Sequence, residues 1–127
     1  NGYADFGLMY SFTGCTSTAQ AQNTTQFLGA NGGQAAIDNT AFLVPHSTLV
    51  KTAYIAVVST PAVGQTFTFN LKNGSTTIGT LVVSNGGFGG TITSNTAVSA
   101  YSQISIESIF SATSGSSNVR YSINMLS

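Results

Sequence analysis

The sequence predicts an all-β protein: a single antiparallel β-sandwich, organised as an eight-stranded jelly roll. Three observations predict it. Val, Ile and Thr are abundant, apolar and polar residues alternate over several short runs, and these runs recur about every ten residues with turn residues between them. No stretch has the i, i+3, i+4 apolar spacing of a helix. An immunoglobulin-like sandwich is the alternative, which the absence of Trp and of a cysteine pair disfavours.

The first predicted strand covers residues 4–12, and a long polar excursion follows it. Apolar residues share one parity along this strand, and Asp5 and Ser11 occupy the other, which is the pattern of a half-buried strand. Residues 13–38 are rich in Gly, Ala and polar residues, with one short apolar anchor at Phe27-Leu28. A connection this long is unusual and often carries contacts or function. We assign residues 1–127 to one domain, with this excursion between the first and second strands.

The next predicted strands are more strongly apolar. AFLVPH (41–46) predicts an edge strand, because Pro45 has no N–H to donate to a ladder. LVKTAYIAVVS (49–59) is nearly continuously apolar, which predicts a strand covered on both faces. In QTFTFNLKNGSTTIGTLVVS (65–84) two alternating runs predict a hairpin. Phe67, Phe69 and Leu71 face the core, and Asn73-Gly74 supplies the positive φ angles of the turn.

Three further strands complete the predicted eight: TITSNTAVSA, YSQISIESIF and VRYSINML. In the second of these, Ile104 and Ile106 face inward and Glu107 faces outward. In the last strand one apolar face is predicted, made of Val119, Tyr121, Ile123 and Met125.

Low charge excludes several classes of function. Charged residues make up 5% of the chain, against an ordinary share of about 25%. Nucleic acids and anionic lipids are recognised by clustered Lys and Arg, so we expect no nucleic-acid partner. No apolar run approaches the ~18 residues of a membrane helix, so we expect no membrane insertion.

Catalytic and metal-binding chemistry has few candidates. His46 is the only histidine, with Ser47 beside it and Asp38 upstream, but no G-x-S-x-G elbow is present. A hydrolase using His46 is therefore a remote alternative, and a His46 that hydrogen-bonds locally at a strand end is favoured. One His and one Cys do not make a zinc site. Asp38 in IDNT is a weak calcium candidate, against the more usual Asp of a turn. We predict no catalytic residue, no metal and no cofactor.

Two further features suggest contacts. Cys15 is the only cysteine, so it forms no disulfide within the chain. A small hydrophobic role is favoured for it, and an intersubunit disulfide is the alternative. In NGGFGG (85–90), Asn85 and Phe88 are weak candidates for binding a glycan, since sugar sites combine an exposed aromatic ring with amides.

An almost uncharged sandwich suits assembly, because interface cores are depleted in charge. We expect a homo-oligomer, and amphipathic tyrosines are the candidate contacts. The candidates are Tyr3, Tyr10, Tyr54, Tyr101 and Tyr121.

Two stretches carry a resemblance to known proteins. GYADFGLMY looks like the YADFYALM-type strand that follows collagen-like repeats in spore-surface and related fibre proteins. FLVPHSTLVKTAYIAVVSTPAVGQTFTFNLKNGSTT is similar to small jelly-roll modules of phage and giant-virus surface proteins. The resemblance implies a trimeric, TNF-like jelly-roll head on a surface fibre, with no catalytic residues to carry over. No collagen repeat is present in this chain.

Three functions follow as hypotheses. The first is a non-enzymatic, self-associating structural module, extracellular or on the surface of a virion, a spore or a cell filament. The second is an adhesion module that binds a host-surface receptor or a glycan. The third is the hydrolase using His46.

Overall fold

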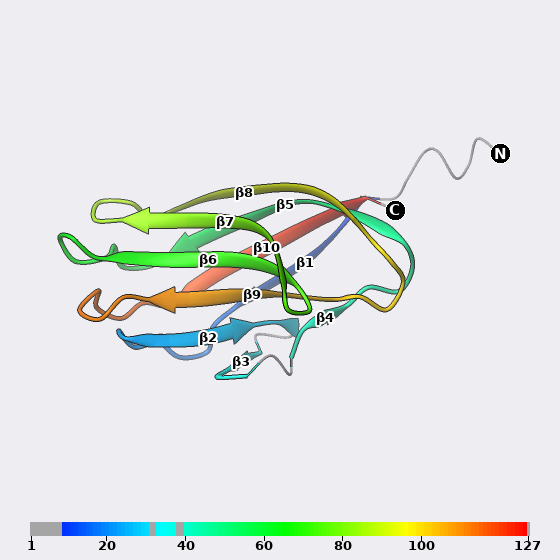
Figure 1. Cartoon of the computed structure of the whole chain (residues 1–127). Helices are drawn as coiled ribbons and strands as arrows, with labels where there is room; N and C mark the ends of the chain where they lie inside the picture. Colours follow the sequence, from blue (N-terminus) through cyan, green and yellow to red (C-terminus); the bar gives the residue numbers. More distant parts are fainter. Residues whose placement is uncertain (1–8, 31–32, 38–39, 127) are drawn as a thin grey trace.

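Two antiparallel sheets form a sandwich in the computed structural model, which describes residues 9–30, 33–37 and 40–126 (Figure 1). The described residues contain ten strands and no α-helix. Sheet I has the order β1-β10-β5-β8, from β1 (Met9–Cys15), β10 (Val119–Leu126), β5 (Thr48–Val57) and β8 (Gly89–Val98). Sheet II has the order β3-β2-β9-β6-β7, from β3 (Gln34–Ala35), β2 (Thr24–Leu28), β9 (Gln103–Phe110), β6 (Thr66–Asn73) and β7 (Thr76–Ser84). A short strand, β4 (Phe42–Leu43), also pairs with β9.

The strand pairs are nested, which confirms the predicted jelly roll. β6 pairs with β7, β5 with β8, β2 with β9 and β1 with β10. The chain is therefore one long hairpin whose successive strand pairs alternate between the two sheets. This order differs from the ABED and CFG sheets of an immunoglobulin domain, so the alternative fold is excluded. The other two strands, β3 and β4, have two residues each and are additional to the eight strands of the roll.

The second strand of the roll is not where the sequence analysis placed it. It is β2, which lies inside the polar excursion predicted over residues 13–38, and β3 follows it there. Within β2 only Leu28 is fully buried, so the apolar pattern there is weak, while backbone pairing with β9 holds the strand. The strand predicted over residues 41–46 shrinks to β4, because the chain turns away before the exposed Pro45 and His46.

The core between the sheets follows the predicted parities. Phe67, Phe69 and Leu71 of β6 are completely buried, and Phe67 stacks on Phe110 of β9 with 3.8 Å between ring centroids. β10 contributes its predicted apolar face, which is buried throughout: Val119, Tyr121, Ile123 and Met125. On β9, Ile104 and Ile106 are buried, and Glu107 lies on the outer face as predicted.

The β6–β7 hairpin turn is shifted by one residue from its predicted position. Asn73 pairs with Thr76, so the two loop residues are Gly74 and Ser75. Only Gly74 has a positive φ, of 58°. Positive φ at the first loop residue alone defines a type II′ turn, in which glycine is preferred at that position. Asn73 therefore remains in the strand.

β5 is covered on one face only, contrary to the prediction. Ala53, Ile55 and Val57 are buried in the core, whereas Tyr54 and Ala56 on the opposite face are exposed. The described part of the chain places no layer over the outer face of sheet I. β5 thus has the composition of a strand that is buried on both faces, but its outer face is exposed.

Candidate functional site

The outer face of sheet I is a regular array of mostly uncharged side chains, with Arg120 as the charged member of the rows that contain Tyr54 and Ala56. Cross-strand pairing aligns its residues in rows that run across β1, β10 and β5. One row is Thr13, Ser122 and Tyr54, and the next is Cys15, Arg120 and Ala56. Residues directly opposite one another in such a ladder have Cβ atoms about 5 Å apart, so the six side chains form one surface.

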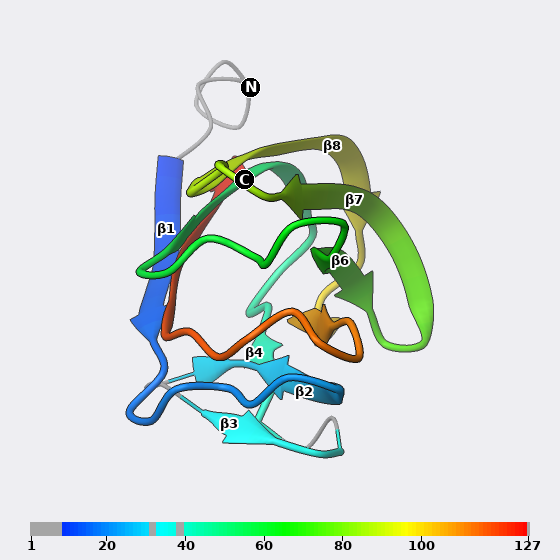
Figure 2. The ribbon, with the colours of Figure 1, turned by 90° about the vertical axis from the view of Figure 1, so that its left-hand side faces the viewer.

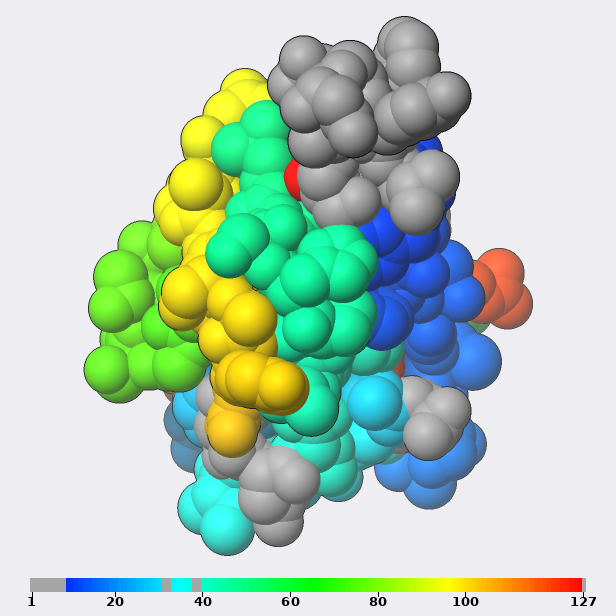
Figure 3. Space-filling view, turned by 90° about the vertical axis from the view of Figure 1, so that its right-hand side faces the viewer, coloured from blue at the N-terminus to red at the C-terminus, as the bar shows by residue number. Residues whose placement is uncertain are grey.

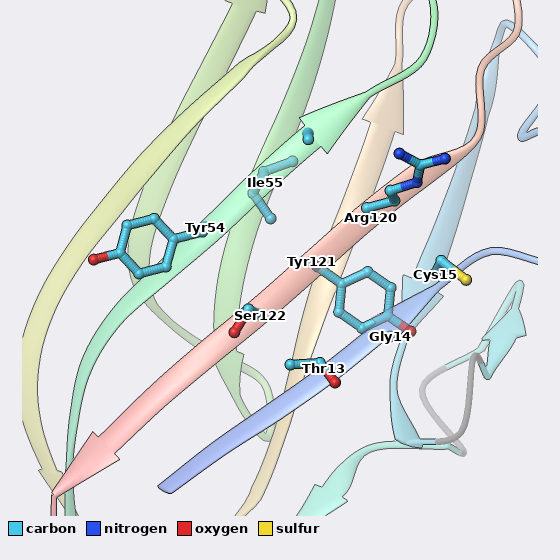
Figure 4. A pocket seen from close by; sticks show the side chains of 9 residues that line it. Thr13, Gly14, Cys15, Tyr54, Ile55, Arg120, Tyr121 and Ser122 are labelled. Atoms are coloured by element: carbon cyan, nitrogen blue, oxygen red, sulfur yellow. The ribbon is translucent and has the colours of Figure 1, made fainter. Parts of the chain in front are cut away.

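A groove of about 480 Å³ lies on this surface, lined by the two rows and by the backbone beneath them. Figure 4 shows Tyr54 extending from β5, Arg120 from β10 and Cys15 from β1. The groove exists because Ala56 is short while Tyr54 and Arg120 on either side are long. Tyr54 is 47% exposed. The site therefore combines an aromatic ring, one cation and several hydroxyl groups in an open depression.

Among the described residues that line the groove, Arg120 is the only one with a charged side chain. Among the described residues it has no ion pair and no side-chain hydrogen bond. The outer face of sheet II differs, because its polar groups are already paired. There Thr80 donates to Asn70 Oδ1 at 2.8 Å, and Asn70 Nδ2 donates to Glu107 Oε1 at 2.9 Å. On the outer face of sheet II these polar side chains are hydrogen-bonded to one another, whereas on sheet I the Arg120 side chain has no such partner among the described residues.

Tyr121 supports the groove from below and is not part of the surface. Its side chain is 3% exposed, and its hydroxyl donates to the Gly29 carbonyl at 2.8 Å. Burial, and secondarily the neighbouring charge of Cys15, raise the pKa of Tyr121 to about 12. Gly14 lies opposite Tyr121, where a Cβ atom would stand 2.7 Å from the ring. The predicted interface role of Tyr121 is therefore wrong for this chain, because the ring is used in the core.

The other predicted interface tyrosines are scattered. Tyr54 stands at the groove, and Tyr10 is half-buried at the edge of the sandwich, in ring contact with Phe12. Tyr101 is 75% exposed with a φ of 67°. Its N–H donates to the Val44 carbonyl at 2.7 Å. Figure 3 shows the segment near residue 100 packed beside the segment after β4. Tyr3 lies outside the described residues.

Cys15 is an exposed free thiol at the rim of the groove, so the favoured prediction of a small, buried or half-buried hydrophobic residue is wrong. Its predicted intersubunit disulfide stays a prediction.

His46 is exposed, and among the described residues its contacts are with Ser47 and Tyr10. Its Nδ1 lies 3.3 Å from the Ser47 carbonyl, and its ring centroid is 6.0 Å from that of Tyr10. Asp38, the proposed acid and calcium candidate, lies outside the described residues. Within the described ranges no three His, Cys, Asp or Glu residues cluster to hold a metal ion.

Asn85 and Phe88 belong to the loop between β7 and β8, and this loop lies at the end of the sandwich that faces the viewer in Figure 2. Phe88 is 57% exposed. Asn85 Nδ2 donates to the Pro61 carbonyl at 2.8 Å, and the Gly86 N–H donates to Thr60 Oγ1 at 2.6 Å. The amide predicted to bind a sugar is thus engaged in holding two loops together, while the aromatic ring stays free.

Of the groove residues, Tyr54 and Cys15 were candidates from the sequence, whereas Ala56, Arg120, Thr13 and Ser122 were not. The available signal was the uninterrupted apolar run of β5, which indicated that the outer face of this strand is covered. Which residues share that face depends on the pairing of β5 with β10 and of β10 with β1, and those partners are distant in sequence.

The fold and the site define a jelly-roll β-sandwich with one open, nearly uncharged sheet face. No protein-family model matches the chain, and a search of the curated proteins returned no match. Nothing in the described part of the chain forms a helix with the length and apolar character needed to cross a membrane.

Proposed function

We propose that this protein is a non-enzymatic structural module that self-associates, as a trimer, through the outer face of sheet I. Its place is the head of an extracellular fibre or filament, or the surface of a virion or spore. The resemblance of residues 2–10 and of residues 42–77 to fibre-head and virus-surface modules supports this placement.

The observation that carries the proposal is the open side of β5. Near-continuous apolar strands are found where both faces of a sheet are covered. Tyr54 and Ala56 on β5, and Val58 just beyond it, are exposed in the single chain. A second subunit on sheet I would remove these side chains from water, at about 25 cal/mol for each Å² of apolar surface. Low charge keeps the cost of this burial small, since Arg120 is the one groove cation to desolvate.

A closed trimer also suits the charge pattern better than a symmetric dimer. In a two-fold contact the same patch of both subunits meets itself, so the two Arg120 side chains would lie in the same contact and bring like charges together. In a three-fold ring each contact joins two different patches. Arg120 then meets different residues of its neighbour, and like charges are not forced together.

Adhesion is the second candidate, favoured by the exposed Phe88 together with Val63, which is 84% exposed, on two hydrogen-bonded loops. Both side chains lie in loops that project beyond the ends of the strands (Figure 1). A glycan array on the intact protein tests this candidate. Binding that Phe88→Ser removes supports it, and an array with no signal contradicts it.

Size-exclusion chromatography with light scattering tests the assembly. We expect a particle of three times the 13.0 kDa chain. Ala56→Lys places a second cation beside Arg120 inside the groove, so we expect it to yield monomers that keep the far-ultraviolet circular dichroism of the wild type. Val82→Lys is the matched control, because Val82 is 53% exposed on the outer face of sheet II. A monomeric wild type, or a trimer that Ala56→Lys leaves intact, contradicts the proposal.

A further inference from the structure

Each sheet of the sandwich ends in two edge strands, and one of the four differs from the rest. Along the main order of strands, sheet I ends in β1 and β8, and sheet II in β3 and β7; β4, of two residues, also pairs with β9 alone. An edge strand carries a row of unpaired backbone N–H and C=O groups, which other strands can pair with. Proteins that stay monomeric protect such edges with short strands, bulges, Pro or charged side chains.

Three of the edges are protected. β3 has only two residues. In β7 the register shifts opposite Leu71 and Lys72, which leaves Ile78 as an extra, bulged residue. In β8 the register shifts opposite Val50 and Thr52, and Asn95 has a φ of 51°. Bulges twist an edge and interrupt its row of free groups, so neither β7 nor β8 offers a regular template.

β1 has none of these protections. Its seven residues pair with β10 in unbroken register. Its sequence, MYSFTGC, contains no charged residue and no Pro. Figure 2 shows β1 as the outermost strand on its side of the sandwich, and no other described strand pairs with it.

The backbone groups that face the free edge can be assigned. The Thr16 N–H donates to the Val119 carbonyl on β10 at 2.9 Å. In an antiparallel ladder alternate residues turn both their N–H and C=O to the same neighbour. Gly14, Phe12 and Tyr10 therefore turn theirs toward β10, and the free edge is formed by the alternate set: Met9, Ser11, Thr13 and Cys15.

We propose that this edge pairs with β1 of a second copy, antiparallel, to join two sheets I into one. A single register uses all seven residues, with Phe12 opposite Phe12 of the other copy. In that register Ser11 lies opposite Thr13, and Met9 lies opposite Cys15. All four free residues of each chain then find hydrogen-bonding partners in the ladder.

The side chains favour a second copy as the occupant. Because β1 has no charge, the two-fold contact sets no like charges opposite each other. The central Phe12 pair is an aromatic cross-strand pair, and Phe12 and Tyr10, both half-buried at the edge, become covered on their open side. The contact also continues the outer face of sheet I from one copy to the next. It uses the edge of the sheet and does not depend on the trimer contact through the outer face of sheet I proposed above.

Disulfide trapping tests the contact and its register. In a hydrogen-bonded antiparallel pair the Cα atoms are about 5.5 Å apart, inside the range that a disulfide spans. Met9→Cys therefore places a new thiol opposite Cys15 of the other copy. With oxidised glutathione, each bond formed consumes two thiols and one glutathione disulfide and releases two reduced glutathione molecules. We expect a covalent dimer on a non-reducing gel for Met9→Cys, and no dimer for the wild type, whose two Cys15 residues lie at opposite ends of the ladder.

Two further changes in the Met9→Cys background separate edge pairing from other contacts. Ser11→Pro removes a donor that faces the free edge without taking one from the β10 ladder, so we expect the dimer to be lost. Ser11→Ala is the matched control, because it also removes the 2.6 Å bond to Asn124 Oδ1 but keeps the N–H. Ala56→Lys blocks the face and should leave the covalent dimer in place, because the disulfide retains edge-paired copies that dissociate during chromatography. The proposal is overturned if Met9→Cys crosslinks no more than the wild type, or if Ser11→Pro chains that retain their fold crosslink as well as Ser11→Ala.

Discussion

The substitution Tyr121→Phe tests how the buried tyrosine under the groove stabilises the fold. The hydroxyl donates to the Gly29 carbonyl at 2.8 Å, and both residues are buried. Removing the hydroxyl leaves that carbonyl without a partner, which costs about 1–2 kcal/mol. We therefore expect the free energy of unfolding at pH 7 to fall by about that amount.

The same substitution should change the dependence of stability on pH. The pKa of Tyr121 is raised to about 12 in the fold, from about 10 in an unfolded chain. The neutral phenol therefore contributes stability that is complete below pH 10 and is lost as the pH rises toward 12. At pH 11 the wild type has lost about 1.4 kcal/mol of this contribution. The Phe variant has nothing to lose there, so the difference between the two proteins should shrink toward zero.

Urea unfolding followed by circular dichroism at pH 7, 9 and 11 measures this difference. One protein concentration is used throughout, because association shifts apparent stability. Tyr101→Phe is the control, since that ring is 75% exposed and its loss should stay within about 0.5 kcal/mol. A difference between Tyr121→Phe and the wild type that stays constant from pH 7 to pH 11 would show that ionisation of the Tyr121 hydroxyl does not destabilise the fold.

Three other substitutions test the packing by the same unfolding assay. Gly14→Ala places a Cβ atom 2.7 Å from the Tyr121 ring, so we expect the free energy of unfolding to fall by about 1–3 kcal/mol. In a variant whose Tyr121 ring has already been removed, Gly14→Ala should cost less than half of that amount. Ser117→Ala removes an oxygen that accepts two backbone N–H groups, each at 3.0 Å, which should cost about 1–3 kcal/mol. Phe67→Ala empties a fully buried site and breaks the stack with Phe110, at about 3–5 kcal/mol. Losses below about 0.5 kcal/mol would contradict each of them.

Strands with strong alternation could be located from the sequence, whereas β2 could not. The parities of β6, β9 and β10 were predicted because each places large apolar residues on one face. β2 buries little more than Leu28, and its position depends on pairing with residues 106–110 of β9. Backbone hydrogen bonds between segments so distant in sequence leave no local pattern to read. Conversely, AFLVPH has the composition of a strand, but its ladder pairing with β9 is limited to Phe42 and Leu43, and the chain bends at His46 and Ser47.

The candidate site was predictable in kind but not in detail. The run LVKTAYIAVVS indicated that both faces of one strand need cover, and this pointed toward a partner for the outer face. Arg120 gave no signal, because an isolated Arg next to a buried Tyr reads as an ordinary exposed residue of an alternating strand. Its place at the groove follows from the register that sets it opposite Cys15 and Ala56. Registers are fixed by the whole ladder, so no single segment reveals them.

The small number of charges explains why a face and an edge are both open in this fold. A single Lys on β1 would discourage edge pairing at low cost to stability, and this is how many sheets are protected. The described charged residues lie elsewhere: Lys72 and Glu107 on sheet II, where hydrogen bonds engage them, and Lys51 and Arg120 on β5 and β10 of sheet I. Without charge, long-range steering of subunits is weak, so partners are selected after contact, by shape and by backbone register. A bulge on β7 and another on β8 then matter as much as the open edge of β1, because they leave one regular edge and so limit the ways in which two copies can join.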